Sequence, residues 1–301
     1  MRLRAPTLGD LPQLVELFSA LQEQGIGGAS EAELRDWFAN PMFDPGVDFR
    51  VALADGRAVG WCDVWDRDRG GSCFWLDVRA DPRAEETYDA LLEFGLGRAC
   101  ELARGAAVAR VIVESEDDVL AASVRRSGFA PMRYAFRMEL DLADEPAPPR
   151  WPEGIAVRTY VSEDARAVYD AEAEVFAGDW NYTRLDFEDW CHQHVLSSEF
   201  DPGLWFLAEA EGELAGFSLC RSERRPGTGH VGGLGVRMPW RRRGLGSALL
   251  LHSFRELRRR GRARADLGVD ADNPTGALRL YEGVGMRVAH RWDTYERSLG
   301  L

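Results

Sequence analysis

The chain has 301 residues, of which 45% are hydrophobic and 10% aromatic, a composition too rich in apolar residues for a disordered protein. All 37 basic residues are arginine, and 50 acidic residues give a net charge of −13, which argues against general nucleic-acid binding. Apolar runs such as Ala248–Leu251 are far shorter than the roughly 18 residues of a membrane span, and no secretory leader or C-x-x-C pair occurs. We therefore expect a cytoplasmic protein of two domains with reduced thiols and neither nucleic-acid nor membrane partners.

The first half of the chain predicts a mixed sheet flanked by helices, because strand and helix patterns alternate along it. An acid followed by glycine, Asp55-Gly56, is typical of a hairpin turn. The expected elements are a strand at 1–4, a helix from residue 10, hairpin strands at 50–54 and 58–62, a strand at 74–78, a helix at 90–103 and a closing strand after 127–129.

A segment with four prolines, residues 143–154, interrupts this alternation and predicts a linker. The same order of elements then starts again, and a second acid-glycine turn, Glu211-Gly212, corresponds to Asp55-Gly56. We therefore predict two mixed α/β (α+β) domains that arose by duplication, with the division 1–142, 143–154 and 155–301.

The charge is unevenly distributed along the second half. Residues 221–264 contain thirteen arginines and two acids, a local charge of +11, so that the other 257 residues carry −24. Such a basic segment within an acidic chain indicates an anionic ligand.

Within the basic segment, a strand ending at Val236 is followed by Pro239 and by a helix that starts near Gly244. Glycines at 244 and 246 would let a ligand approach backbone N–H groups at the positive end of the helix dipole. The arginines at 241–243 would add charge-assisted donors. A dinucleotide fingerprint needs a third glycine and a P-loop needs a lysine, so the sequence predicts a different phosphate or pyrophosphate site.

Residues 236–246 read V-x-x-P-x-R-x-x-G-x-G, and residues 273–286 read N-P-T-G-A-L-R-L-Y-E-G-V-G-M. In this order and spacing, the two segments resemble the acetyl-CoA loop and the N-x-x-A-x-x-L-Y-x-x-x-G-F segment of the GNAT acetyltransferases, with Met286 replacing the usual phenylalanine. The resemblance is close over 155–299 and extends to the first half in outline.

The resemblance implies two GNAT-like domains in tandem and direct acetyl transfer from acetyl-CoA to a primary amine of a small molecule in a ternary complex. It implies that Tyr281 protonates the departing CoA thiolate and that Asn273 binds the pantetheine arm. The other residues expected at the cofactor are Leu234, Val236, Arg241, Arg242, Arg243, Gly244, Leu245, Gly246 and Ser247.

His230, at the start of the strand that ends at Val236, is the candidate general base, since an imidazole pKa of about 6.5 suits removal of an ammonium proton. A surface histidine after the preceding turn is the alternative. We expect Trp180, Tyr182 and Arg221 on the acceptor side, where aromatic and acidic residues would suit a cationic amine. The alternative is that the tryptophans Trp180 and Trp190 cover the core.

No metal site is expected. If residues 191–194 form a helix, His192 and His194 point in roughly opposite directions, and only Cys191 and His194 share one side. Zinc requires three or four ligands.

The first half lacks the expected acetyl-CoA loop. When the two long helices are aligned in sequence, Glu86 corresponds to Gly244, Tyr88 to Gly246 and Val124 to Tyr281. A carboxylate about 4 Å from a phosphate charge would cost on the order of 4 kcal/mol. We therefore predict that this degenerate domain does not bind acetyl-CoA and is structural or forms a wall of the substrate channel.

The tandem layout resembles that of the mycothiol synthases within the same family, whose acceptor is a cysteinyl-glucosaminyl-inositol amine. His230, Arg221 and Gly268 depart from the residues expected there, so that specific activity is an alternative to acetylation of another small amine. An alternative of another class is a non-catalytic acyl-CoA-binding or assembly protein. The chain is expected to be a monomer or homodimer.

Overall fold

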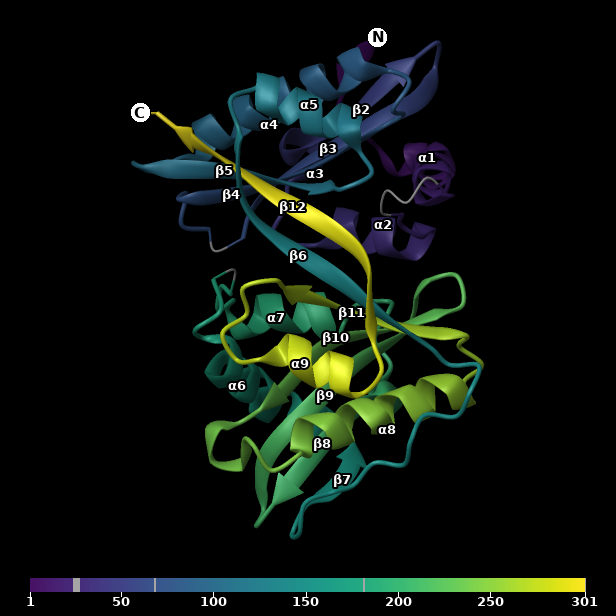
Figure 1. The fold of residues 1–301 in the computed structure, drawn as a ribbon. Helices are drawn as coiled ribbons and strands as arrows, with labels where there is room; N and C mark the ends of the chain where they lie inside the picture. Colours follow the sequence, from purple (N-terminus) through teal and green to yellow (C-terminus); the bar gives the residue numbers. More distant parts are fainter. Residues whose placement is uncertain (24–27, 68, 181, 301) are drawn as a thin grey trace. The chain divides into compact units, whose positions relative to one another are not determined.

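The computed structural model describes residues 1–23, 28–67, 69–180 and 182–300. The chain splits into two compact units, one made of Met1–Tyr134 with Arg291–Leu301 and the other of Ala135–His290. Among the described helices, none has both the length and the apolar character that a membrane crossing requires. The expectation of a mixed α/β fold is confirmed, because each unit contains a mixed sheet with helices packed on it (Figure 1).

The first unit has the strand order β1-β2-β3-β4-β5-β12, with β4 and β5 parallel and the other neighbours antiparallel. Its elements are β1 (Arg2–Arg4), η1 (Leu8–Asp10), α1 (Leu11–Glu23), α2 (Glu31–Ala39), α3 (Pro45–Asp48), β2 (Phe49–Ala54), β3 (Arg57–Asp66), β4 (Cys73–Ala80), α4 (Glu85–Leu102), β5 (Ala107–Glu114) and α5 (Asp118–Arg126).

The second unit has the strand order β6-β11-β10-β9-β8-β7, with β10 and β11 parallel. The elements of the second half of the chain, together with β6, are β6 (Ala130–Asp141), β7 (Ala156–Thr159), η2 (Ser162–Asp164), α6 (Ala165–Phe176), α7 (Phe187–His194), η3 (Pro202–Leu204), β8 (Trp205–Ala210), β9 (Glu213–Arg225), β10 (Thr228–Val236), η4 (Met238–Trp240), α8 (Leu245–Arg259), β11 (Arg264–Asp270), α9 (Ala277–Gly283) and β12 (Arg287–Leu299).

The last strand of each half of the sequence lies in the sheet of the other half (Figure 1). Residues Trp292–Leu299 of β12 pair antiparallel with β5, and residues Ala135–Asp141 of β6 pair antiparallel with β11. Tyr295 of β12 is buried in the core of the first unit. The bounds of the two units therefore differ from the predicted domain bounds, 1–142 and 155–301. Duplicated strands present similar edges to either sheet, so hydrophobic alternation does not determine which sheet a strand enters.

The predicted linker, residues 143–154, also lies within the second unit. It connects β6 to β7 without regular structure, and Arg258 and Arg255 of α8 donate hydrogen bonds to the carbonyls of Leu142 and Pro146. The segment therefore packs along α8 instead of separating two bodies.

The repeated order of elements is matched by details of the backbone. The turn residues Asp55 and Gly56 have φ values of 49° and 78°, and Glu211 and Gly212 have φ values of 54° and 82°. Two successive residues with positive φ are typical of type I′ hairpins, which the acid-glycine pairs predict. The same sequence signal has therefore produced the same turn twice.

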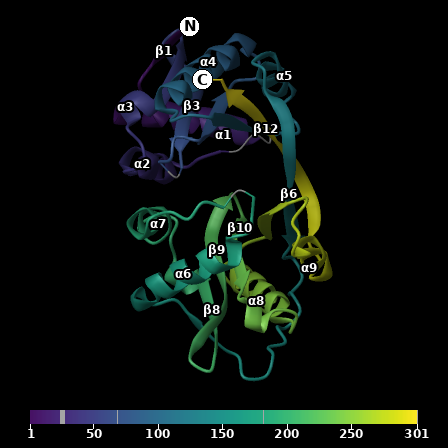
Figure 2. The same ribbon diagram turned by 90° about the vertical axis from the view of Figure 1, so that its left-hand side faces the viewer.

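The sheet of the second unit lies between two helical layers. One face of α8 carries an apolar stripe at helical spacing, Leu250, Phe254 and Leu257, which is fully buried against the sheet. The other face is covered by α6, which packs on β9 and β10 (Figure 2). This arrangement leaves the carboxyl end of β10 to lead directly into the N-terminus of α8.

Candidate active site

Strands β10 and β11 pair with each other only at their beginnings. Thr228–His230 lie opposite Arg264–Asp266, after which β10 continues beside β9 and β11 continues beside β6. In the described part of the chain, no strand pairs with the β11-facing edge of β10 beyond His230. Backbone groups on this edge are therefore available to a ligand that enters between the strands.

The loop between β10 and α8 owes its shape to one glycine and its packing to another. Gly244 has φ +84°, and an added Cβ would meet no atom within 4 Å, so only the left-handed backbone requires glycine. At Gly246 an added Cβ would lie 3.2 Å from Leu280 Cδ2 of α9. The first helical bond runs from Ala248 N to Gly244 O, and the preceding amides at the start of α8 have no intrahelical acceptor.

Most arginines of the basic segment bind groups of the chain itself. The ion pairs are Arg221–Glu199, Arg225–Glu139, Arg225–Asp266, Arg237–Glu174, Arg255–Glu145, Arg259–Glu256, Arg260–Asp201 and Arg262–Glu223. Within the described residues, no ion pair joins a carboxylate to Arg241–Arg243, and Arg241 Nε instead donates to the carbonyl of Val236 at 2.8 Å. The loop thus retains positive charge for an anion.

Tyr281 of α9 is buried, and its electrostatic neighbours include Asp179 from the loop after α6. Burial and the charge of Asp179 raise the pKa of Tyr281 to about 12, so its hydroxyl stays protonated at neutral pH. Burial and Asp270 raise the pKa of Asp179, and Arg241 opposes that shift. Asp179 therefore acts electrostatically on Tyr281 and is itself influenced by Arg241 of the loop. Asp179 lies outside both motifs, in the segment with Trp180 and Tyr182 where acidic residues were expected to suit a cationic amine.

His230 is buried and is held by a carboxylate. Its Nδ1 lies 2.7 Å from Asp266 Oδ1, and Asp266 is 1% exposed. An added Cβ at Gly229, the preceding residue, would contact Leu257 of α8, so His230 lies on the opposite face of the sheet. The alternative of a surface histidine is therefore wrong. Asp266 was not predicted from the sequence, although an acid among the apolar residues of a strand could have indicated it.

Comparison with known proteins agrees with this geometry. Residues 165–286 match the model of the "Acetyltransferase (GNAT) family". The mycothiol acetyltransferase of Saccharomonospora viridis is 31% identical over 71% of this chain and 74% of its own length. The chain belongs to the GNAT acetyltransferase family.

Other relatives match over shorter segments. The mycothiol acetyltransferase of Streptomyces coelicolor is 37% identical over 50% of this chain, and the match spans about half (48%) of that relative's length. The crystal structure of a GCN5-related N-acetyltransferase from Sphaerobacter thermophilus has a TM-score of 0.79 and 31% identity, and covers 100% of this chain and 96% of that one. A tandem GNAT protein from the clavulanic acid biosynthesis pathway, 18% identical, shares the fold with a TM-score of 0.74.

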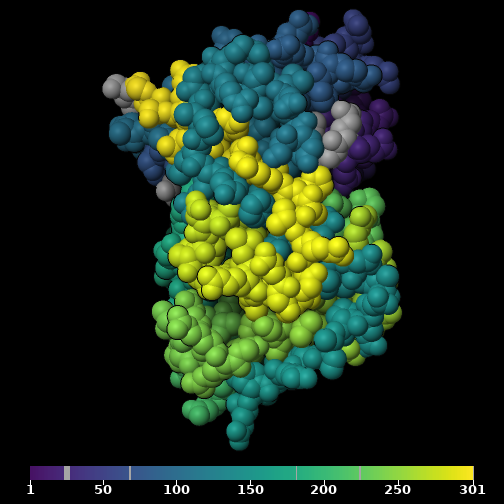
Figure 3. Space-filling model, viewed as in Figure 1, coloured from purple at the N-terminus to yellow at the C-terminus, as the bar shows by residue number. Residues whose placement is uncertain are grey.

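GNAT enzymes use acetyl-CoA, and the loop of this chain fits its pyrophosphate. The left-handed Gly244, the amides at the start of α8 and the cations of Arg241–Arg243 together suit a group with several anionic oxygens. In Figure 3 the surface is hollowed between α9, in yellow, and the green residues around the start of α8.

Asparagine followed by proline, as in Asn273-Pro274, is typical of a helix start, but α9 begins only at Ala277, after Gly276 with φ +80°. The Asn273 side-chain oxygen instead accepts hydrogen bonds from the amide of Thr275 at 2.9 Å and from its hydroxyl at 2.5 Å. Asparagine commonly closes such a local turn in competition with a helix. The amide NH₂ of Asn273 remains the group that could contact a ligand.

The aromatic residues proposed for the acceptor side differ in burial. Trp190 is 3% exposed and packs on Tyr169 and Trp205, so for this tryptophan the core interpretation is correct. Trp180 and Tyr182 are partly exposed in the loop that also carries Asp179. Arg221 lies opposite His230 in the β9–β10 register and pairs with Glu199. No group of three metal-binding side chains gathers in the described ranges.

In the first unit, the position equivalent to Gly246 is filled by a core side chain. Tyr88 is fully buried, and its hydroxyl donates to the Ala80 carbonyl at 2.8 Å and lies 3.0 Å from Asp117 Oδ2. Val124, aligned with Tyr281, is also fully buried. These contacts favour the prediction that this unit does not bind acetyl-CoA.

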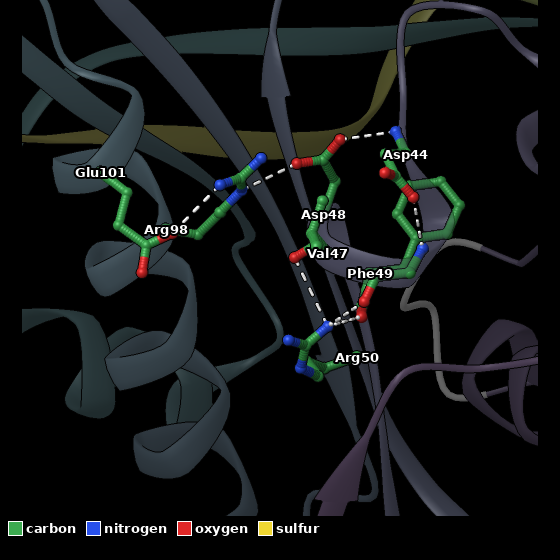
Figure 4. Close-up of polar contacts among 8 residues, drawn as sticks. Asp44, Val47, Asp48, Phe49, Arg50, Arg98 and Glu101 are labelled. Atoms are coloured by element: carbon green, nitrogen blue, oxygen red, sulfur yellow. Dashed lines mark hydrogen bonds and ion pairs between the residues drawn. The ribbon is translucent and has the colours of Figure 1, made fainter.

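A separate pocket of about 550 Å³ lies on the first unit beside Phe94. The two arginines that line this pocket bind groups of the first unit (Figure 4). Arg98 binds Asp48 and Glu101, and Arg50 donates to backbone carbonyls, including that of Phe49 at 2.6 Å. We assign no ligand to this pocket.

We predict that one acetyl-CoA binds per chain and that Gly244→Ala weakens binding at least 10-fold, because the added methyl group disturbs the left-handed turn before α8. Isothermal titration calorimetry measures both quantities. Gly261→Ala is the matched control, since Gly261 also has positive φ (+80°) with open space around it, at the other end of α8. Two sites per chain, or equal weakening by both substitutions, would contradict the assignment.

Proposed function

We propose that the second unit transfers the acetyl group of acetyl-CoA to a primary amine of a small molecule by direct transfer in a ternary complex. The observation that carries this proposal is the contact between the glycine loop and α9, where Gly246 packs on Leu280, the residue before Tyr281. It brings a protonated hydroxyl near the cationic loop. The proposed reaction needs both groups, because the loop binds the pyrophosphate and the hydroxyl protonates the thiolate.

The proposed steps use four kinds of group. Acetyl-CoA supplies an activated acetyl group as a thioester. His230 removes a proton from the ammonium of the acceptor, directly or through water, and the amine nitrogen then forms a bond to the carbonyl carbon. Backbone N–H groups of Leu234 or Val236, on the open edge of β10, donate to the carbonyl oxygen as it gains charge. When the carbon–sulfur bond breaks, Tyr281 gives its proton to the sulfur. The nitrogen loses its second proton as the amide forms, and this proton restores the hydroxyl of Tyr281.

We assign the remaining cofactor contacts as follows. Leu245, Gly246 and Ser247 contribute amides at the start of α8, and Asn273 contributes its side-chain NH₂ to the pantetheine arm. We assign Trp180, Tyr182 and Arg221 to the acceptor side. Asp179 and Asp270 add negative charge near Tyr281, which favours an acceptor that arrives as a cation.

The relatives' name, mycothiol acetyltransferase, makes the amine acceptor of mycothiol synthesis the first compound to test. We keep another small amine as the main expectation, because His230 and Arg221 depart from the residues expected in mycothiol synthases.

A panel of primary amines, including cysteinyl-glucosaminyl-inositol, tests the function with acetyl-CoA. We expect amine-dependent release of CoA and a product heavier by one acetyl group, measured by mass spectrometry because the cysteinyl thiol would interfere with thiol reagents. Micromolar acetyl-CoA affinity without turnover on any amine would instead favour a non-catalytic acyl-CoA-binding protein.

Replacement of Tyr281 by phenylalanine should lower kcat about 100-fold, since general acid catalysis typically contributes that much or more, with little change in the KM for acetyl-CoA. Steady-state kinetics of acetyl transfer measures this split. Tyr88→Phe is the control, because it also removes a buried tyrosine hydroxyl but lies in the first unit. An unchanged kcat in Tyr281→Phe would rule out the proposed acid.

The pH dependence tests His230. A base must be deprotonated to accept a proton, so kcat/KM should rise with pH through the titration of the imidazole. His230→Ala should flatten this rise, whereas His192→Ala, an exposed histidine of α7, should leave it in place. A preserved rise in His230→Ala would assign the base elsewhere.

A further inference from the structure

We propose that Asp266 is a positioning residue that fixes the tautomer of His230 and makes its Nε2 the atom that accepts the proton. This inference rests on the proposed role of His230 as the base. Neither motif of the acetyl-CoA site includes Asp266, which lies in β11.

The register places the pair where the two strands part. His230 and Asp266 form the last paired positions of β10 and β11, and Nδ1 lies 2.7 Å from Oδ1. An ionised carboxylate only accepts hydrogen bonds, so Nδ1 must carry the hydrogen and the lone pair lies on Nε2. An added Cβ at the exposed Gly232 would lie 3.9 Å from Nε2, so this nitrogen lies toward Gly232, two residues further along β10.

A second contact keeps Asp266 ionised despite its burial. Arg225 donates to Asp266 Oδ2 at 2.6 Å and to Glu139 Oε1 at 2.5 Å. Burial alone would raise the pKa of Asp266, but the hydrogen bonds from His230 and Arg225 hold it below its ordinary value. The carboxylate can therefore orient the imidazole throughout the neutral pH range.

The charged groups around His230 also suit a cycle in which the imidazole gains a proton. They are Asp266 of β11, Arg225 and Arg221 of β9, Glu139 of β6, and Glu199, which pairs with Arg221. Glu139 also pairs with Arg137 of β6 at 3.5 Å, so among the described residues three arginines balance three carboxylates. Asp266 is the anion in contact with the ring, and it stabilises the imidazolium formed when His230 accepts a proton.

The test compares Asp266→Asn with Glu139→Gln. Both remove one carboxylate bound to Arg225, but only Asp266 contacts His230. In Asp266→Asn we expect the imidazole pKa of His230, read by NMR and assigned with His230→Ala, to fall by about one unit or more, because a neighbouring anion favours the imidazolium. The acid limb of kcat/KM should move to lower pH and kcat should fall at least 10-fold, with the KM for acetyl-CoA unchanged.

Glu139→Gln should shift the imidazole pKa much less and leave kcat within about 2-fold. Equal effects of the two substitutions, or an unchanged His230 titration in Asp266→Asn, would overturn the proposal. The ¹⁵N spectrum of the unmodified protein tests the tautomer without any variant, so the result does not depend on whether a variant folds. We expect the hydrogen on Nδ1, and a hydrogen on Nε2 would refute the assignment. Because the NMR arms need no turnover, they separate failure of this inference from failure of the proposed acetyl transfer.

Discussion

Strands β10 and β11 separate after three paired residues, and the chemistry proposed here depends on that separation. A continuous ladder would satisfy the backbone groups of β10 and close the entry to a thioester. Because the strands part, one edge of β10 stays available, while the last pair brings His230 and Asp266 together. The strand then leads into the left-handed Gly244, so that the available edge and the helix N-terminus lie consecutively along one segment.

The two units show how one duplicated framework can keep its fold and change its site. The hairpin turns at Asp55-Gly56 and Glu211-Gly212 retain the same backbone geometry. At the equivalent of Gly246, however, Tyr88 fills the space with a buried ring whose hydroxyl is bound by the chain. A side chain of this size supports the core of the first unit and replaces the glycine that a close ligand approach would need.

The arginine-rich segment has two physical roles. Arg225 and most of its neighbours in β9 and α8 form ion pairs within the unit, and Arg225 balances the buried carboxylate of Asp266. Arg241–Arg243 instead keep their charge at the start of α8. The absence of lysine means that the chain has no ε-amine for a nearby thioester to acetylate.

The sequence by itself determined the features that depend on local spacing: the hairpin turns, the apolar stripe of α8, the glycine loop at 244–246 and the repeated order of elements. Only the tertiary structure decided that β6 and β12 exchange sheets, that Asp266 meets His230 across 36 residues, and that Asp179 lies near Tyr281. Strand partners and side-chain neighbours depend on register between distant segments, and similar strand edges leave several pairings open. A local pattern therefore reveals which element forms, and packing selects what that element touches.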